Sequence, residues 1–184
     1  MSNSEMTFCT LKILHTSIYL FNKYGFYKVG IDRIIENARV SKSAFYYNFQ
    51  SKEKLIEMCL SFQKDTLKDK VFSTISYRDP IVFDKLKEIF FLHVDLEGFY
   101  YLQFKAIFEI EKLYPKAYRV VIAYRNWLIN EIYKLLLTIK STASVEDAYI
   151  FLYIIDGSIM QLLDNNSVDD REHLINYFFK LCCV

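Results

Sequence analysis

The stretch VSKSAFYYNFQSKEKL, residues 40–55, decides the fold of this 184-residue chain. It predicts a short helix over residues 42–49, because the hydroxyl of Ser41 can cap the helix N-terminus. Phe45 and Phe49 are four residues apart and therefore share one face, which we expect to be buried. The opposite face would then be free to meet a partner.

The segment before this stretch predicts two more helices. A helix over residues 31–38 would begin at Gly30 and join the next helix through a tight turn, as in a helix-turn-helix. A supporting helix would end at Gly25 in the left-handed conformation, with Phe26 folding back on it. The apolar residues expected in the shared core are Ile18, Phe21, Ile34, Ile35, Ala38, Val40, Phe45 and Phe49.

The outer face of the helix over residues 42–49 suits the major groove of DNA. Residues 40–50 include no acidic side chain, so no carboxylate would face the phosphates. Small and hydrogen-bonding side chains allow a close approach to base edges. The residues on this face are Lys42, Ser43, Ala44, Tyr46, Tyr47 and Asn48.

Further motifs accompany residues 40–55, namely Ile13-Leu14, Leu20-Phe21, Gly25-Phe26 and Ile31-Asp32-Arg33-Ile34. With them, the N-terminal third of the chain resembles the TetR (tetracycline-repressor type) transcription regulators. Apolar stripes and capping signals along the chain predict about nine helices, and this all-α fold fits the family. The resemblance implies a helix-turn-helix DNA-binding domain over residues 1–50 and a ligand-binding and dimerisation domain over residues 51–184.

The resemblance also implies which residues contact DNA. Lys42, Ser43 and Ala44 would contact base edges or nearby phosphates. Tyr46, Tyr47 and Asn48 would contact the phosphate backbone and neighbouring bases. Lys52 would contact a phosphate. Tyrosine hydroxyls, a lysine and a helix N-terminus are sequence-neutral phosphate binders, which agrees with these roles. The alternatives are aromatic packing for the two tyrosines and plain solvent exposure for the two lysines.

The chain departs from the family pattern at three positions. Arg39 stands at the turn position that Gly usually holds, Ser43 replaces another common Gly, and Gly30 stands where Ser or Thr normally caps. Arg39 would either strain the turn or add a backbone contact. These departures bear on which operator is read.

The composition and the helix start signals favour the same architecture. Four Gly and two Pro are too few for the turns of an all-β fold. The net charge is +1, and its positive excess lies in the N-terminal third, which hints at a region that faces a polyanion. Start signals for later helices occur at Ser51, Pro80, Pro115, Ser144 and Ser167.

The last two expected helices, over residues 144–163 and 169–183, are candidates for the dimer surface. Residues 150–155 are apolar on every side, which is more than one buried face requires. Gly157 stands inside a helix, where small residues permit close approach of a partner helix; packing within one chain is the alternative. The predicted interface residues are Ile150, Ile154, Gly157, Ser158, Gln161, Tyr177 and Phe178.

An effector cavity is expected among the helices of residues 62–139, where aromatic residues are dense. Such a pocket would suit a lipophilic small molecule, aromatic or cationic, whereas ordinary core packing is the alternative. The predicted lining residues are His93, Phe99, Tyr101, Phe104, Phe108 and Trp127.

Other features predict absences. Cys9, Cys59, Cys182 and Cys183 form no C-x-x-C pair, so we expect reduced thiols, no metal and no cofactor. The most apolar stretch, residues 148–163, is shorter than the about 20 residues that span a bilayer. The N-terminus has no signal-peptide pattern, and we expect a cytoplasmic protein without a membrane partner.

These observations predict a homodimeric repressor that binds a palindromic double-stranded operator and is released by a small molecule. One alternative is a helical interaction protein that kept the fold but lost specific DNA binding. Another is an enzyme that uses the aromatic cavity. The sequence has no G-x-S-x-G, H-E-x-x-H, P-loop or dinucleotide motif, so we expect no enzyme activity.

Overall fold

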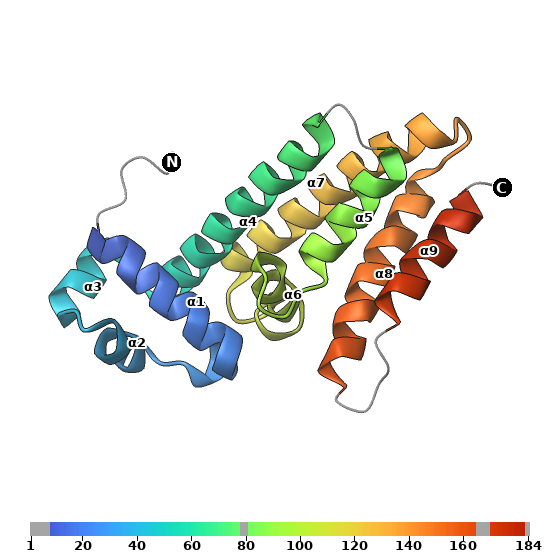
Figure 1. Cartoon of the computed structure of the whole chain (residues 1–184). Helices are drawn as coiled ribbons and strands as arrows, with labels where there is room; N and C mark the ends of the chain where they lie inside the picture. The colour runs from blue at the N-terminus through green and yellow to red at the C-terminus, as the bar shows by residue number, and fades with distance from the viewer. Residues whose placement is uncertain (1–7, 78–80, 165–169, 183–184) are drawn as a thin grey trace. The chain divides into compact units, whose positions relative to one another are not determined.

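A computed structural model describes residues 8–77, 81–164 and 170–182 of the chain (Figure 1). These residues form nine α-helices and no strand, which confirms the predicted all-α fold. The helices are α1 (Phe8–Lys28), α2 (Ile31–Ala38), α3 (Lys42–Phe49), α4 (Lys52–Ser76), α5 (Val82–His93), α6 (Phe99–Glu109), α7 (Pro115–Ile139), α8 (Val145–Leu163) and α9 (Arg171–Cys182).

The helices belong to two compact units. The N-terminal unit comprises Met1–Lys64 and Leu102–Val121, and the C-terminal unit comprises Asp65–Tyr101 and Ile122–Val184. Each of α4, α6 and α7 therefore begins in one unit and ends in the other. The predicted division of function between residues 50 and 51 stays a prediction.

In the N-terminal unit, α1 packs against α2 and α3 (Figure 1). Two predicted serine caps are present, because Ser41 Oγ accepts from Ala44 N–H and Ser51 Oγ accepts from Lys54 N–H, each at 3.1 Å. Each hydroxyl satisfies an N–H that the first turn of a helix leaves without a helical partner.

The supporting helix α1 is interrupted at Gly25, as predicted. Gly25 has φ 82° and ψ 162°, so its φ is positive, whereas its ψ is extended rather than left-handed helical. Phe26 is buried and stacks on Phe21 with ring centroids 5.0 Å apart, which confirms that it folds back on the helix.

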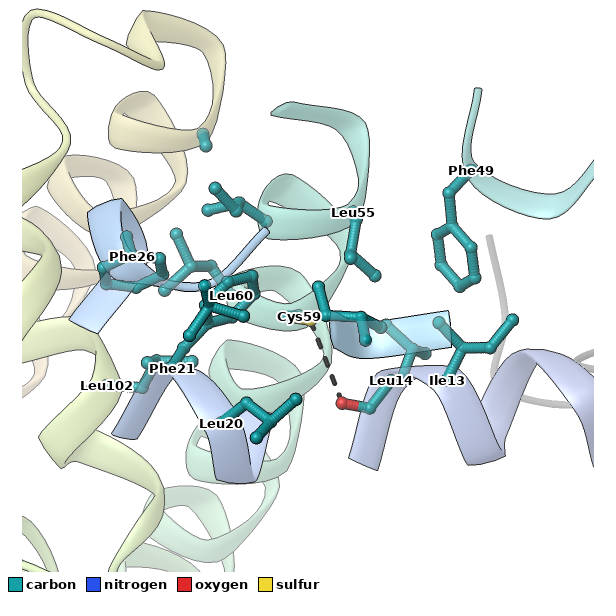
Figure 2. Packing of buried hydrophobic residues seen from close by; sticks show 14 of the residues in the cluster. Ile13, Leu14, Leu20, Phe21, Phe26, Phe49, Leu55, Cys59, Leu60 and Leu102 are labelled. Atoms are coloured by element: carbon teal, nitrogen blue, oxygen red, sulfur yellow. Dashed lines mark hydrogen bonds between the residues drawn. The ribbon is translucent and has the colours of Figure 1, made fainter. Parts of the chain in front are cut away.

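The core of the N-terminal unit joins the helix-turn-helix to α1 and α4 (Figure 2). Burial of this apolar surface is the main stabilising contribution to such a unit. Cys59 of α4 lies inside it with its Sγ 4.0 Å from the carbonyl of Leu14. The core residues from α1 to α4 include Ile13, Leu14, Leu20, Phe21, Phe26, Ile34, Ala38, Phe45, Phe49, Leu55 and Leu60, and Leu102 and Ala106 come from α6.

The C-terminal unit has its own core, in which α9 packs on α5 and α8. Phe151 of α8 meets Phe90 of α5 and Phe178 of α9 edge-on, with ring centroids 6.4 and 5.4 Å away. All three phenylalanines are buried. Aromatic side chains thus join these helices.

The predicted helix starts in this part of the chain have different outcomes. Pro115 is the first residue of α7, as expected. Ser144 and Asp147 form the predicted capping box at the start of α8, in which Asp147 accepts the N–H of Ser144 at 2.8 Å. Pro80 and Ser167 lie outside the described residues.

In the described part of the chain, no helix combines the length and hydropathy that crossing a membrane requires.

Candidate functional site

The helix α3 presents a polar face and buries an apolar one. Phe45 and Phe49 are fully buried, as their spacing predicts. Tyr47 is 88% exposed and Tyr46 is 41% exposed, and Lys42 is also exposed. The exposed hydroxyls and ammonium group are available to contact phosphates.

The first turn of α3 is polar and held in place. Ser43 Oγ lies 2.9 Å from the Oγ of Ser41, and Lys42 Nζ lies 3.6 Å from the carboxylate of Asp32. Both charged side chains of that ion pair are mostly exposed, so it contributes little to stability. Ala44 is half-buried and has no side-chain polar group.

Asn48 has a structural role that the sequence analysis did not anticipate. Its Oδ1 accepts a hydrogen bond from Thr10 Oγ1 on α1 at 2.7 Å, and its Nδ2 donates to the carbonyl of Ala44 at 2.7 Å. The side chain therefore ties α3 to α1. Its predicted contact with DNA stays a prediction.

Arg39 makes the turn between α2 and α3 in the left-handed conformation, with φ 49° and ψ 53°. This conformation costs an L-residue roughly 1–2 kcal/mol, which is why Gly is usual at such a turn. The N–H of Arg39 donates to Glu36 O at 3.1 Å and that of Val40 donates to Ile35 O at 3.2 Å. The turn thus keeps a helix C-cap geometry in spite of the side chain.

Lys52 begins α4 and is half-buried. Its Nζ lies 5.7 Å from the ring centroid of Tyr114, within reach of a cation–π interaction. Burial lowers the pKa of Lys52. The lysine predicted to bind a phosphate is therefore held beside an aromatic ring.

In the C-terminal unit, the predicted effector residue His93 is fully buried and hydrogen-bonded. Its Nδ1 lies 2.6 Å from the carbonyl of Ile89, which can only accept, so Nδ1 carries the proton. Its Nε2 then accepts from the hydroxyl of Tyr124 at 2.7 Å. Burial lowers the pKa of His93 to about 4, although the bond to Ile89 opposes that shift.

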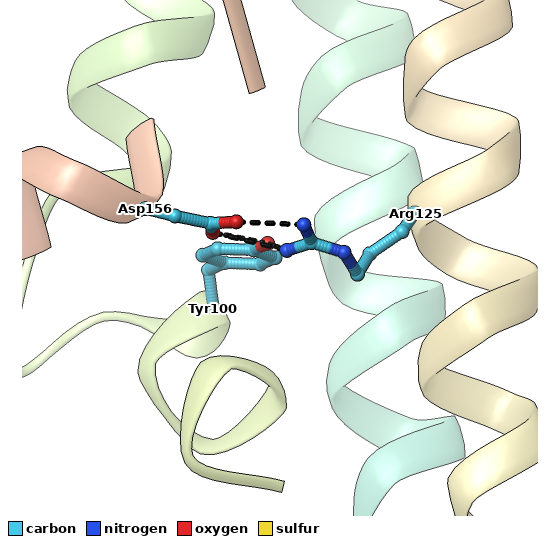
Figure 3. Close-up of polar contacts among 3 residues, drawn as sticks. All are labelled: Tyr100, Arg125 and Asp156. Carbon is cyan, nitrogen blue, oxygen red and sulfur yellow. Dashed lines mark hydrogen bonds and ion pairs between the residues drawn. The ribbon is translucent and has the colours of Figure 1, made fainter. Parts of the chain in front are cut away.

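A second cluster of polar side chains, which is largely buried, includes Tyr100 of α6 (Figure 3). Arg125 of α7 forms two hydrogen bonds to the carboxylate of Asp156 of α8, at 2.6 and 3.0 Å, and donates to Tyr100 Oη at 2.5 Å. The Tyr100 hydroxyl donates to Asp156 at 3.3 Å. We call Tyr100, Arg125 and Asp156 the polar triad.

The surroundings of the polar triad favour a protonated Tyr100 and a charged Arg125. Burial and the charge of Asp156 raise the pKa of Tyr100. Burial alone would lower the pKa of Arg125, but its bonds to Asp156 and Tyr100 raise it. The arrangement is a charge-assisted contact among three helices, with a bidentate arginine–carboxylate pair at its centre.

The sequence alone does not predict the polar triad. Asp156 was visible only as an interruption of an apolar stretch. A carboxylate inside an apolar helix is costly unless it is paired, so this interruption was a usable signal for a buried cation partner. It could not indicate Arg125, because the partner is 31 residues away in sequence.

The other predicted effector residues are divided between the two units. Trp127 is half-buried, and its ring lies 5.6 Å from that of Tyr124 and 4.7 Å from the Nζ of Lys68. The half-buried ring of Phe99 lies 5.7 Å from Lys70 Nζ, and Tyr101 is also half-buried. In the N-terminal unit, Phe104 is buried and contacts Phe108, which is 69% exposed.

The predicted dimer residues differ in exposure. Ile150, Gly157 and Tyr177 are exposed, Ile154 and Gln161 are half-buried, and Ser158 and Phe178 are buried within the C-terminal unit. The exposed side of α8 also includes five apolar residues that the prediction omitted, namely Val145, Tyr149, Tyr153, Met160 and Leu163.

Within residues 8–77, 81–164 and 170–182, no three His, Cys, Asp or Glu side chains meet as metal ligands. Of the four cysteines, Cys9 and Cys59 are free thiols. Burial raises the pKa of Cys59, so this thiol stays protonated. Cys183 lies outside the described residues, as does the side chain of Cys182.

Comparison with known proteins supports the reading of the N-terminal unit. Residues 13–59 match the family model described as bacterial regulatory proteins, tetR family. The matched segment includes α2, α3 and the residues that we predict to contact DNA. A search of curated protein sequences found no match.

Solved structures resemble the fold of the whole chain. A TetR transcriptional regulator from Legionella pneumophila has a TM-score of 0.83 at 15% identity, over 98% of this chain and 99% of that one. Reduced NemR from E. coli has a TM-score of 0.81 at 16% identity, over 94% and 96%. A TetR-family regulator from Streptomyces coelicolor has a TM-score of 0.78 at 21% identity, over 95% and 92%.

Proposed function

We propose that the chain is a DNA-binding transcription regulator of the tetR family, not an enzyme, and that it acts as a homodimeric repressor. It would bind a palindromic operator and leave it when a small lipophilic effector binds. The effector would act through a difference in affinity between the DNA-competent and DNA-incompetent states.

The observation that carries the proposal is the two-sided character of α3. Phe45 and Phe49 fix the helix to the core, and the exposed side offers Lys42, Tyr46 and Tyr47. No carboxylate interrupts this side within residues 40–50. A helix with these properties can enter a major groove while its flanking groups bind phosphates.

The test begins with selection of binding duplexes from a random library by the wild-type protein. We expect Tyr47→Ala and Lys52→Ala to weaken binding to the selected duplex by about tenfold each, because hydrogen bonds to charged groups contribute about 1.5–3 kcal/mol. Each loss should be similar for all duplexes, since phosphate contacts carry no sequence information.

Tyr27→Ala is the matched control, because Tyr27 is 80% exposed, belongs to α1 and is not among the residues predicted to bind DNA. Unchanged affinity of both Tyr47→Ala and Lys52→Ala would contradict the assignment of DNA contacts. If the wild type selects no duplex, the alternative of an interaction protein without specific DNA binding gains support.

The apolar exposed side of α8 supports dimerisation. Tyr153 is 62% exposed and Met160 is 60% exposed, and a Cβ added at Gly157 would meet no atom within 4 Å. Large apolar side chains on one exposed face commonly mark an interface. A dimer would place two recognition helices in successive major grooves, roughly 34 Å apart.

Sedimentation can test this dimer. We expect Tyr153→Glu to shift the protein to monomers, because the interface would then bury an unpaired charge. Tyr77→Glu is the control, since Tyr77 is 65% exposed but lies outside the predicted interface. A Tyr153→Glu protein that remains dimeric would exclude this face.

The aromatic side chains around Trp127 support the effector proposal. Tyr124 and Phe72 flank the indole at 5.6 and 5.2 Å. Aromatic compounds that weaken binding to the selected duplex should lose that effect with Trp127→Leu. An undiminished effect in the variant would place the effector elsewhere.

A further inference from the structure

Two charged side chains of α6 bind the main chain of α1 at the place where α1 is interrupted. Glu109 Oε2 accepts the N–H of Phe26 at 2.7 Å. Lys105 Nζ donates to the carbonyl of Asn22 at 2.9 Å and to that of Phe21 at 3.3 Å. All of these residues belong to the N-terminal unit.

These contacts replace a helical hydrogen bond that is lost where α1 is interrupted. In a continuous α-helix, the N–H of Phe26 would bond to the carbonyl of Asn22, four residues earlier. The non-helical backbone at Gly25 lies between the two groups. Here the carbonyl has a cationic partner and the N–H has an anionic partner, so both main-chain groups are satisfied by α6.

The spacing of the two charged residues on α6 allows both of them to reach the main chain of α1. Lys105 and Glu109 are four residues apart and share one face of the helix. Both are half-buried, and burial lowers the pKa of Lys105 while the charge of Glu109 opposes that shift. We call this pair of residues the α6 clamp.

The surroundings of Gly25 show how closely the α6 clamp fits. A Cβ at Gly25 would lie 2.8 Å from Glu109 Oε2, which is closer than side-chain carbons normally come to an oxygen. The glycine therefore allows both the positive φ and the approach of the carboxylate. A third contact from the same helix, Gln103 Nε2 to the carbonyl of Leu60 at 2.7 Å, ties α6 to α4.

The end of α1 matters for DNA binding because α2 and α3 rest on this helix. The packing of α1 against both of them and the bond from Thr10 to Asn48 at 2.7 Å connect α1 to the predicted recognition helix. A rotation or shift of α1 would therefore displace α3.

We propose that Lys105 and Glu109 are positioning residues for operator binding, which act through α1 and do not touch DNA. The inference rests on the proposed function and adds two residues outside the helix-turn-helix to those that operator binding requires. By holding the end of α1, the α6 clamp holds α3 in the orientation that a bound operator requires.

The test uses full-length protein and the duplex selected by the wild type. We expect Glu109→Ala and Lys105→Met each to weaken binding to this duplex by about tenfold, corresponding to the loss of one charge-assisted hydrogen bond. Glu109→Gln should keep most of the affinity, because an amide oxygen can still accept the N–H of Phe26. Non-specific affinity for competitor DNA should not fall.

A second readout separates positioning from general stability. We expect insertion of one base pair between the half-sites of the selected duplex to weaken wild-type binding. This preference for the original spacing should be smaller in Glu109→Ala and Lys105→Met. Glu111→Ala and Lys112→Met are matched controls with the same charge changes on exposed residues of the same unit. They should behave like the wild type.

Three outcomes decide the inference. If the clamp variants match their controls in affinity and spacing preference, it is wrong. It is also wrong if their loss of affinity only follows the fraction unfolded at the assay temperature, measured by thermal unfolding. A wild type that selects no duplex contradicts the proposed function itself, and the inference fails with it.

Discussion

Polar side chains have different partners in the two units. In the N-terminal unit, the hydroxyls of Ser41 and Ser51 and the side chains of the α6 clamp bond to main-chain groups where a helix begins or is interrupted. In the C-terminal unit, the polar triad and the pair of His93 and Tyr124 bond side chain to side chain across different helices. The first arrangement satisfies main-chain groups, and the second pairs side chains of different helices with one another.

The difference has an energetic consequence. A cap at a helix end contributes about 1 kcal/mol, because water can replace part of the lost bond. A buried charge that loses its partner costs about 3–5 kcal/mol, because water cannot reach it fully. The C-terminal unit should therefore be the more sensitive of the two to single polar substitutions.

The largest expected effect comes from the polar triad. We expect Arg125→Met to reduce the free energy of unfolding by about 3–5 kcal/mol, because Asp156 would lose its charged partner. The side chains of Arg125 and Asp156 are 15% and 20% exposed, which favours the lower end of that range. Urea unfolding at one fixed protein concentration measures the change.

Two variants complete this experiment. Lys42→Met removes an ion pair in which both side chains are mostly exposed, the pair with Asp32, and should cost less than about 0.5 kcal/mol. Combining Arg125→Met with Asp156→Leu should recover much of the stability, because no unpaired charge remains. If Arg125→Met costs no more than Lys42→Met, the two units do not differ in the way we describe.

The next effect depends on pH. The neutral imidazole of His93 is favoured in the folded state, where burial lowers its pKa from 6.5 to about 4. Between these values the unfolded chain binds a proton that the folded chain does not, so stability falls as the pH falls. This difference should remove about 3 kcal/mol from the free energy of unfolding by pH 4.

His93→Gln isolates that contribution, because carboxylates elsewhere titrate in the same range. The variant should lose less stability than the wild type between pH 7 and pH 4. Parallel pH curves for the two proteins would show that His93 does not carry the effect.

A smaller effect is expected at Gly25 in the N-terminal unit. Its backbone lies in a region that is almost exclusive to glycine, so Gly25→Ala should cost about 2 kcal/mol. Gly157→Ala makes the useful contrast in α8, where an added Cβ meets nothing within 4 Å. There alanine should raise the stability of the protomer by about 0.5–1 kcal/mol. Equal changes at both positions would argue against this account.

The smallest effect should be a gain in stability. Arg39→Gly relieves a left-handed arginine, but the greater freedom of glycine in the unfolded chain offsets part of that gain. We expect a net increase of about 0.5 kcal/mol by urea unfolding. Asn37→Gly, inside α2, should instead cost up to about 0.5 kcal/mol. A loss of stability in Arg39→Gly would mean that the arginine side chain makes a compensating contact.

The features of the N-terminal unit that depend on near neighbours could be predicted from the sequence. Ser41 and Ser51 cap the helices that they were expected to cap, and Gly25 has the expected positive φ. Each of these features depends on a few adjacent residues. Such local interactions leave a pattern in the sequence.

The contacts among distant residues could not be predicted in the same way. Glu109 meets Phe26 across 83 residues, and Arg125 meets Asp156 across 31. Periodicity shows which face of a helix is buried, but it does not show which other helix covers that face. The sequence therefore predicted the all-α fold and the helix-turn-helix, while the α6 clamp and the polar triad required the structure.

Trp127 offers a practical consequence, because it is the only tryptophan in the chain. Lys68 lies over its ring at 4.7 Å, and Tyr124 and Phe72 flank it. Its intrinsic fluorescence is therefore a label-free optical signal that comes from the C-terminal unit alone. A compound that displaces Lys68 from the indole should change the emission, so candidate effectors can be screened before any operator sequence is known.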